Sequence, residues 1–302
     1  MQINVVKKQG LCVKMWILEK ALKSIQYTQE VPGAFGHLHL SSLIGVILIS
    51  LVLCVFLRDA GDKTFRVIIG IMFCVMLAGE LIKQFIEPLS MVDGVIVRSY
   101  SWGAFPFQLC STPLYILPIL ALTPDSKIRD AAAAYTMTAA LIGGIAVYAT
   151  PFTVFSEYAF SNVQTMVHHG IQIVSGIYVA CYYRRRLGLK FYLGGMAVFA
   201  VMLGIALYLD TAFYDMLLRT GRIVEGEMFN MFYISPRLGM ISPFYEELLN
   251  SLGPAVYVPM YAAAILLLSA VIVIAAKRIC KLMSGINFPT KHKKSADIKM
   301  ER

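Results

Sequence analysis

Seven stretches of predominantly apolar residues alternate along the chain with shorter polar or charged connections. Each stretch is about 18 to 23 residues long, which is the length that an α-helix needs to cross the ~30 Å hydrocarbon core of a bilayer. We therefore predict an all-α, polytopic integral membrane protein whose seven transmembrane helices form one bundle. The predicted spans are 37–57, 66–87, 105–122, 131–150, 163–183, 190–209 and 256–276.

Composition supports this fold class. Apolar residues make up 58% of the 302 residues and charged residues only 15%, so most of the chain is suited to lipid. The third span is unusual because Pro113 and Pro118 each remove a backbone donor, and kinks or neighbouring helices must then satisfy the freed carbonyl groups. Seven spans fit the pattern better than six or eight.

Two flanking segments differ from the membrane part. Lysines and apolar residues alternate around Trp16, which predicts a short amphipathic helix at the membrane surface rather than a cleaved signal peptide. The end of the chain is polar and basic. We therefore divide the chain into an N-terminal amphipathic segment at 1–35, a seven-helix membrane domain at 36–278 and a basic cytoplasmic tail at 279–302.

Basic residues concentrate in the connections on one side of the predicted bundle. That side carries three, two, four and eight of them, in the order 58–66, 123–130, 184–190 and the tail after 276. The opposite side carries one, none and three, in the order 88–104, 151–162 and 210–255. By the positive-inside rule the first side is cytoplasmic, which predicts a multi-pass protein of the cell membrane with a cytoplasmic C-terminus. The lysines of the N-terminal segment disagree with this rule.

The net charge of +9 is explained by contact with the lipid headgroups of the membrane. Basic residues beside the cytoplasmic face attract anionic lipid headgroups, at about 1 kcal/mol for each Lys or Arg near the surface. We expect anionic lipid as the partner of these residues and no nucleic acid.

Polar residues inside the predicted spans are the candidates for function. Cys110 and the pair His168 and His169 lie at nearly the same depth, each about five residues inside the outer end of its span by the 1.5 Å helical rise. Glu80, with Lys83 three residues later, lies in the outer half of the second span. Unpaired polar groups are costly in lipid, so such residues are functional candidates by default.

The six cysteines show no C-x-x-C spacing and no shared outer loop, so neither disulfides nor a structural zinc site is expected. Most of them lie in or beside apolar stretches, where a free cysteine usually packs as a small apolar side chain. Cys110 differs because Gln108, Ser111 and Thr112 give it polar surroundings. A catalytic thiol and a packed core thiol both stay open at this position.

The histidines support a polar interior. On a helix, one stripe consists of Gln164, His168, Gln172 and Ser175, and His169 lies ~100° away. The alternative is a core histidine that only bonds a backbone carbonyl.

The other polar candidates could also have a purely structural role. Glu80 and Lys83 form either a helix-packing ion pair or part of a site, because residues three apart share one helix face. We interpret His37 and His39, at the outer edge of the first span, as interfacial.

The long outer connection 210–255 contains a short apolar piece at 228–234. It is far too short to span a membrane, so we expect it to dip into the interface or to cover the bundle. Asn230 and Tyr233 lie in it and are candidate supporting or substrate-binding residues.

Three runs, in this order and with these gaps, resemble the YwaF family of bacterial integral membrane proteins over about residues 35–275. They are FPFQLC ending at Cys110, VQTMVHHG ending at Gly170 and FNMFYISP ending at Pro236. The resemblance implies a fold shared with a eukaryotic acyltransferase that moves polyunsaturated acyl chains onto ether phospholipids through a cysteine. It also implies a more distant relation to androgen-induced hydrolases of fatty acyl esters.

Carried onto this chain, the resemblance places the nucleophile at Cys110 and the general base at His169, which precedes Gly170. His168 has no clear counterpart, and Gln108 stands where many relatives have a histidine. The implied function is a membrane-embedded thiol acyltransferase or lipid ester hydrolase that acts on phospholipid-like substrates and needs no cofactor or metal.

The chemistry of the residues agrees with this function. A thiol attacks an ester only as thiolate, so Cys110 needs a base such as His169 within hydrogen-bond reach. We expect Gln108, Asn230 or a freed backbone N–H to stabilise the oxyanion, and Glu80 to orient His169.

Two other classes of function stay open. A zinc-dependent seven-helix lipid hydrolase needs about three converging ligands, and the sequence has no H-x-x-x-H pair to begin such a site. A transporter or membrane assembly protein would use the intramembrane polar residues as a pathway, although no inverted internal repeat is visible.

Overall fold

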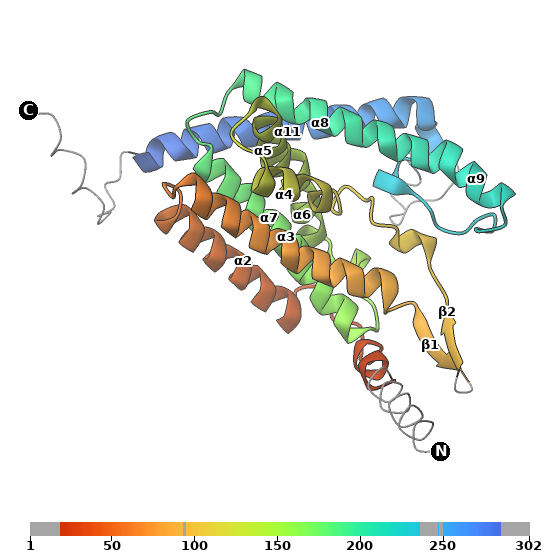
Figure 1. Ribbon diagram of the computed structural model, residues 1–302. Coiled ribbons are helices and arrows are strands. Elements are labelled where there is room, and N and C mark those ends of the chain that lie inside the picture. The colour runs from red at the N-terminus through yellow and green to blue at the C-terminus, as the bar shows by residue number, and fades with distance from the viewer. Residues whose placement is uncertain (1–18, 93–94, 236–246, 248–249, 285–302) are drawn as a thin grey trace, which may run out of the picture.

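The computed structural model describes residues 19–92, 95–235, 247 and 250–284, and helices dominate it (Figure 1). The structure is 73% helix and 3% strand, which confirms a mostly helical fold. The all-α prediction needs one correction, because β1 (Leu89–Val92) and β2 (Val95–Arg98) pair as an antiparallel hairpin. The signal was present in the sequence: β-branched residues flank an Asp-Gly dipeptide, which favours hairpins.

The helices follow the predicted spans in order. Their bounds are α2 His37–Phe56, α3 Asp62–Phe85, α4 Pro113–Leu122, α5 Lys127–Tyr135, η2 Thr136–Ala140, α6 Leu141–Ala149, α7 Ala159–Tyr182, α8 Leu189–Tyr208, η4 Leu209–Phe213, α9 Tyr214–Arg219 and α11 Pro254–Ser284. Five stretches of described helix are long and apolar enough to cross a membrane: α2, α3, α5 to α6, α8 to α9 and α11. The ten-residue α4 and the more polar α7 are not among them, so the predicted count of seven is not confirmed.

The third predicted span is helical only in its second half. We expected a helix from residue 105, but α4 begins at Pro113, and the η1 turn (Trp102–Ala104) and irregular backbone come before it. Proline is favoured at the first helical position, and Pro106 disfavours the helical conformation at Phe105. The irregular stretch therefore carries Cys110 in a turn instead of on a helix face.

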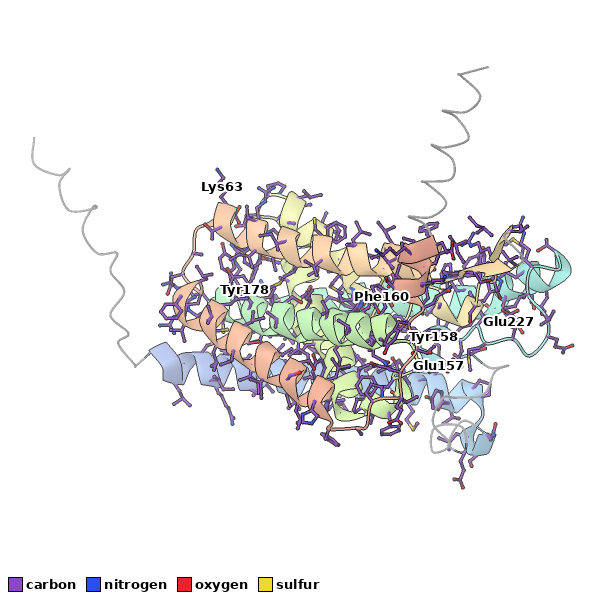
Figure 2. All side chains as sticks on the ribbon, turned by 90° about the horizontal axis from the view of Figure 1, so that it is seen from below. Lys63, Glu157, Tyr158, Phe160, Tyr178 and Glu227 are labelled. Carbon is purple, nitrogen blue, oxygen red and sulfur yellow. The ribbon has the colours of Figure 1, made fainter. Side chains whose placement is uncertain are left out.

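Helix α7 occupies the middle of the bundle and contacts α2, α3, α6 and η2. Figure 2 shows it running from Phe160, at the end of the bundle near Glu227, to Tyr178, at the end near Lys63. Its polar stripe faces inward, because His168, His169 and Gln172 are all buried. The sequence prediction that this face turns away from lipid is confirmed.

Two π-helical turns interrupt the long helices. The turn η2 joins α5 to α6, and η4 joins α8 to α9. The sixth span was predicted to end at residue 209, but the helix continues to Arg219. Asp210, the first residue after the predicted end, lies within this helix, and its buried carboxylate accepts a hydrogen bond from the Met231 backbone N–H.

The outer faces of the long helices are apolar and exposed. Examples are Ile44, Ile47 and Leu48 on α2, Ile71 on α3, Val201 on α8, and Leu267 and Val271 on α11. Exposed apolar surface of this extent marks contact with lipid or with a partner. Together with the five candidate spans, it agrees with a multi-pass membrane protein.

At one end of the bundle, which we call the basic end, ion pairs join the short connections between helices. Arg186 donates to Asp125 and Asp130 at 2.6 Å, and Arg184 pairs with Asp59. The hydrogen bonds from Arg186 hold the pKa of the Asp125 carboxyl below its ordinary value. Some basic residues that predict the cytoplasmic side therefore also tie its loops together.

The opposite end carries the hairpin and the described part of the N-terminal segment (Figure 1). Residues 26–29 pass the start of α7, where Gln29 N donates to Glu157 O at 2.8 Å and Ala159 N donates to Tyr27 O at 3.0 Å. The predicted amphipathic helix around Trp16 lies outside the described residues. What is described of this segment is therefore attached to the bundle.

Candidate functional site

A cavity of about 530 Å³ opens at the end of the bundle that carries the hairpin. Cys110, His168 and His169 all line it, together with Gln108 and Lys83. The residues come from α3, from the turn before α4 and from α7, which are far apart in the sequence. The structure thus brings the predicted nucleophile and both histidines to one polar cavity.

The turn that carries Cys110 is held by its neighbours. Ser111 N donates to Gln108 O at 2.8 Å. The hydroxyl of Tyr135, the last residue of α5, donates to Thr112 Oγ1 at 2.7 Å. Gly143 on α6 lies directly beneath, where a Cβ would lie 3.4 Å from the Cys110 backbone N and Cα. The same Cβ would come within 3.0 Å of Gln172 Nε2, so a side chain at this position requires the Gln172 side chain to shift. Cys110 as a whole residue is partly exposed.

His168 makes the direct contact between α7 and the Cys110 turn. Its Nε2 lies 3.0 Å from the Cys110 carbonyl oxygen. Because a carbonyl only accepts, Nε2 carries the proton and Nδ1 is the basic nitrogen. Among the described residues Nδ1 has no hydrogen-bond partner. His168 was predicted to have a supporting role, but its contact with the Cys110 carbonyl was not predicted.

His169 is oriented by its own helix. Its Nδ1 lies 2.6 Å from the Thr165 carbonyl oxygen, so Nδ1 is the protonated nitrogen and Nε2 is the basic one. Within the described part of the chain Nε2 has no partner. The His168 and His169 rings lie 5.3 Å apart between centroids. Each imidazole therefore has one nitrogen fixed by a backbone carbonyl and a basic nitrogen left over.

Glu80 and Lys83 form the ion pair that their spacing predicted. Glu80 Oε1 lies 2.9 Å from Lys83 Nζ and accepts from Gln84 Nε2 at 2.7 Å. Lys83 reaches the cavity of Cys110, whereas Glu80 lines a neighbouring groove. Glu80 was expected to orient His169, but His169 Nδ1 donates instead to the Thr165 carbonyl oxygen.

Gln108 joins the Cys110 turn to the apolar piece of the long outer connection. Its Nε2 donates to the Asn230 carbonyl at 2.7 Å, and its Oε1 accepts from Phe232 N at 2.9 Å. The side chain was expected to be an oxyanion donor, and both ends of its amide are engaged with backbone. It therefore acts as a connector within the site.

The apolar piece packs onto the helices, as its sequence predicts. Phe229, Asn230, Met231, Phe232 and Ile234 are buried. The Asn230 side chain accepts from Ser235 N at 2.8 Å, which closes a loop within the piece. Asn230 and Tyr233, both predicted as supporting or substrate-binding residues, do not line the cavity of Cys110.

Strained backbone accompanies this packing. Phe232 and Tyr233 both have φ of 56°, in the left-handed region that side chains with a Cβ rarely adopt. Each such residue costs of order 1–3 kcal/mol and persists only where its surroundings hold it. Gln108 and Asp210, which bond to the backbone N–H groups of Phe232 and Met231, supply that restraint.

Two site residues were missed by sequence reasoning. Lys83 was considered only together with Glu80 and was not named among the candidate site residues, and Asp210 was not singled out. The signal for Asp210 was a single acidic residue inside a long apolar run. Such a residue either ends a helix or is buried with a partner, and only the fold distinguishes the two.

A second, larger groove of about 770 Å³ adjoins the cavity, and Phe105 and Tyr100 line both. Most of its lining is apolar and comes from α3, the stretch before α4, and α4 itself. The groove is lined by Phe73, Leu77, Leu81, Phe85, Pro106, Leu114 and Tyr115, with Arg98 and Arg222 as its cations.

The structure also bears on the two histidines at the start of α2 and on metal binding. His37 is exposed, but the interfacial reading of His39 is wrong, because His39 is fully buried between the rings of Phe35 and Tyr148. It is the third residue of α2, and its ring contacts Tyr148 of α6. No group of three or more His, Cys, Asp or Glu side chains within the described ranges is arranged to hold a metal ion.

The fold and the cavity define a multi-pass membrane protein with a polar site inside one end of its helix bundle. A sequence model of the TMEM164 family matches residues 34–277, which is most of the chain. The chain therefore belongs to the TMEM164 family. The predicted membrane class is confirmed, while the YwaF name and the link to an acyltransferase stay predictions. No match is found among curated proteins or among solved structures.

Proposed function

We propose that this protein is a membrane-embedded acyltransferase or lipid ester hydrolase that acts on phospholipid-like substrates through an acyl thioester on Cys110. The observation that carries the proposal is the shared cavity: Cys110 and two histidines whose imidazoles keep a basic nitrogen line it together. A nucleophile, a base and an oriented partner for the base are the parts that covalent acyl transfer requires.

The first half-reaction forms the thioester. His169 Nε2 takes the proton of the Cys110 thiol, and the thiolate attacks the ester carbonyl carbon of the lipid. The carbon–oxygen bond to the alcohol then breaks, and the alcohol leaves with the proton that His169 held. Thr165 keeps the imidazole in the tautomer that this step needs.

The second half-reaction releases the acyl group. The same imidazole takes a proton from an acceptor hydroxyl, whose oxygen attacks the thioester carbon while the thiolate of Cys110 leaves and regains the proton. A lipid alcohol as acceptor gives acyl transfer, and water gives hydrolysis. In both cases the protein returns to its starting state.

Charge in the cavity supports this chemistry. The Lys83 ammonium lines the cavity and is an available cation for the thiolate and for the developing oxyanion. Its pairing with Glu80 keeps it in place. We assign Lys83 the stabilising role first expected for Gln108 and Asn230, and we assign Gln108 and His168 to positioning the Cys110 turn.

The neighbouring groove fits the lipid. Its apolar lining suits an acyl chain, and Arg98 and Arg222 suit a headgroup phosphate. Because Phe105 and Tyr100 border both spaces, an ester held in the groove lies next to Cys110. The ester linkage of a glycerophospholipid likewise lies between its chains and its phosphate.

We further propose seven membrane crossings, with α4 and α7 added to the five apolar stretches, and with the cavity on the outer side. The basic end supports this orientation, because it carries most of the loop Lys and Arg. An impermeant thiol reagent on intact cells should label a cysteine placed at Glu225 and spare one placed at Lys63, both of which are exposed positions. The reverse labelling would overturn the orientation.

Mass spectrometry of the purified protein tests the reaction. After incubation with vesicles of ester phospholipid, we expect a hydroxylamine-sensitive acyl adduct on Cys110, and none in Cys110→Ser. His169→Gln should slow adduct formation by about 10²–10⁴-fold, the usual share of general acid–base catalysis. Cys74→Ser, which removes an exposed thiol from α3, is the matched control and should behave as the native protein. An adduct of equal yield in Cys110→Ser would refute the covalent mechanism.

A further inference from the structure

The cavity of Cys110 and the groove beside it differ in the chemistry of their linings. Of the 21 described residues that line the cavity, eight carry a hydroxyl group and three carry a carboxamide. The described lining of the groove is mainly apolar and contains no serine or threonine. Small-molecule sites of about 300–1,000 Å³ are usually apolar, with only a few polar groups. The lining of the cavity therefore indicates a ligand that is rich in hydrogen-bonding groups.

Exposure decreases from the mouth of the cavity to its depth. Ser99 and Ser101, which follow β2, are exposed. Tyr158 and Ser161, at the start of α7, are half-buried, and His169 is buried. All five residues line the same cavity. A polar molecule therefore reaches the imidazole of His169 from the exposed serines, without passing through the apolar groove.

Several polar groups of the lining have hydrogen-bonding capacity left for a ligand. Among the described residues, the hydroxyl groups of Ser99, Ser101 and Tyr158 make no hydrogen bond. Glu87 Oε1 accepts from Ser161 Oγ at 2.5 Å, and Glu87 Oε2 has no partner in the same part of the chain. Hydroxyl groups donate and accept, whereas a carboxylate oxygen only accepts. A ligand with several hydroxyl groups matches both kinds of partner.

Charge distinguishes the cavity from the groove. The groove has the guanidinium groups of Arg98 and Arg222, which suit a phosphate. The cavity has the carboxylate of Glu87, which repels one, and its ammonium group on Lys83 is already paired with Glu80 at 2.9 Å. An anionic ligand is therefore disfavoured beside Glu87, and an uncharged polyol is not.

We propose that the cavity is the acceptor site and that the acceptor is a hydroxyl group of a glycerol-like polyol, an assignment that rests on the proposed acyl transfer. The polyol oxygen attacks the carbonyl carbon of the thioester on Cys110, and its proton passes to His169 Nε2. The carbon–sulfur bond breaks, and the Cys110 thiolate regains that proton. The products are an acyl ester of the polyol and the free thiol. Glu87 accepts a hydrogen bond from a second hydroxyl group of the polyol.

Two sources present the same vicinal hydroxyl groups. Free glycerol enters from solvent, past Ser99 and Ser101. Phosphatidylglycerol carries a glycerol headgroup beside its phosphate, so its headgroup occupies the cavity while its phosphate and chains stay on the side of the groove. The two sources are distinguished by their products, which are monoacylglycerol and phosphatidylglycerol acylated on its headgroup.

The test measures the second half-reaction by itself. Detergent-purified protein is acylated on Cys110 by phosphatidylcholine and washed free of lipid on an affinity column. It then receives glycerol, phosphatidylglycerol micelles or lysophosphatidylcholine micelles in separate arms, and mass spectrometry follows the thioester and the products. We expect the acyl ester of glycerol or of the glycerol headgroup to exceed free fatty acid, although water is in large excess over both acceptors.

The outcomes separate this assignment from the proposed function. Release of the acyl group only as fatty acid, or its transfer only to lysophosphatidylcholine, would overturn the polyol assignment and leave the thioester on Cys110 established. If no acyl adduct forms on Cys110, the proposed function fails, and the polyol assignment fails with it.

Glu87→Ala tests the recognition of the polyol. It removes an ionised acceptor, so the glycerol concentration that gives half-maximal deacylation should rise by about tenfold or more, the usual worth of a hydrogen bond to a charged group. The maximal rate should change less, because the contact binds the polyol before and during attack alike. Replacing both Ser99 and Ser101 with alanine should shift the half-saturation in the same direction without touching the bond between Glu87 and Ser161.

Glu157→Ala is the matched control. Glu157 is an exposed glutamate beside Tyr158 at the start of α7 (Figure 2), and it does not line the cavity. Its half-saturating glycerol concentration should equal that of the native protein. The same half-saturation in the control, in Glu87→Ala and in the double serine variant would overturn the assignment of the cavity as a polyol site.

Discussion

Replacing Gln108 with alanine should loosen the apolar piece 229–235 from the turn that carries Cys110. The amide of Gln108 makes two hydrogen bonds to backbone, at 2.7 Å to Asn230 O and at 2.9 Å to Phe232 N. Phe232 is about 1% exposed, so alanine removes the partner of a buried backbone N–H and also the bond to the Asn230 carbonyl. A buried backbone group that loses its partner costs about 1–3 kcal/mol, which predicts a loss of stability of about that size.

The strained residues enlarge the effect on local order. Phe232 and Tyr233 hold left-handed conformations only while their surroundings restrain them. Without Gln108, Met231 N is still bonded to Asp210, but the restraint on Phe232 N is lost. We therefore expect the piece to relax near Phe232 and the Cys110 turn to lose its fixed position.

Two measurements on detergent-purified protein check this prediction. The midpoint of thermal unfolding should fall by several degrees, at about 2–4 °C per kcal/mol for a domain of this size class. Alkylation of Cys110, followed by peptide mass spectrometry, should become faster. Gln164→Ala is the matched control, because Gln164 lines the same cavity and makes no hydrogen bond among the described residues. Equal unfolding midpoints and equal Cys110 alkylation in the two variants would refute the role of Gln108.

Three further variants test other contacts. Gly143→Ala should reduce acyl capture at Cys110, because its Cβ would come within 3.0 Å of Gln172 Nε2 while it touches the Cys110 backbone at 3.4 Å, whereas Gly204→Ala on α8, with no atom within 4 Å of its Cβ, should leave capture unchanged. Asp62→Asn should lower stability by about 3–5 kcal/mol in thermal or denaturant unfolding, because it removes the carboxylate 2.6 Å from buried Arg129, and adding Arg129→Met should recover part of the loss. The pKa of Asp125 is lowered by Arg186, so its contribution to stability is present above its ordinary pKa and is lost as the pH falls through the lower, folded-state value. The unfolding midpoint of Asp125→Asn should therefore fall less steeply than that of the native protein in this acidic range, and parallel curves would contradict the pairing.

Hydrophobic patterning predicted where the helices lie, because burial in lipid imposes both length and composition on each span. It failed where local backbone chemistry decides. Pro106 and Pro113 delay the start of α4, and the bond from Met231 N to Asp210 lets a helix continue through an acidic residue. The apolar piece at 228–234 was expected either to dip into the interface or to cover the bundle, and the burial of Phe229, Met231, Phe232 and Ile234 agrees with the second alternative.

The residues of the site could be predicted from the sequence, but the contacts between them could not. Equal depth of Cys110 and the two histidines placed them in one region, and they line one cavity. Depth does not specify direction around a helix axis, so the sequence did not reveal that His168 reaches the Cys110 carbonyl or that Thr165 fixes His169. The interfacial reading of His39 failed for the same reason, because its position along α2 says nothing of which face packs on α7.

The two histidines are distinguishable because opposite nitrogens are fixed. His168 donates from Nε2 to the turn and keeps Nδ1 basic, whereas His169 donates from Nδ1 to its own helix and keeps Nε2 basic. The Nε2–H group of His168 therefore holds the Cys110 turn in place, and His169 is oriented by a bond within α7. A general base gains and loses a proton in each catalytic cycle, and these changes must not break the contacts that hold the nucleophile in place. His169 meets that condition, since its fixed hydrogen bond does not involve the Cys110 turn.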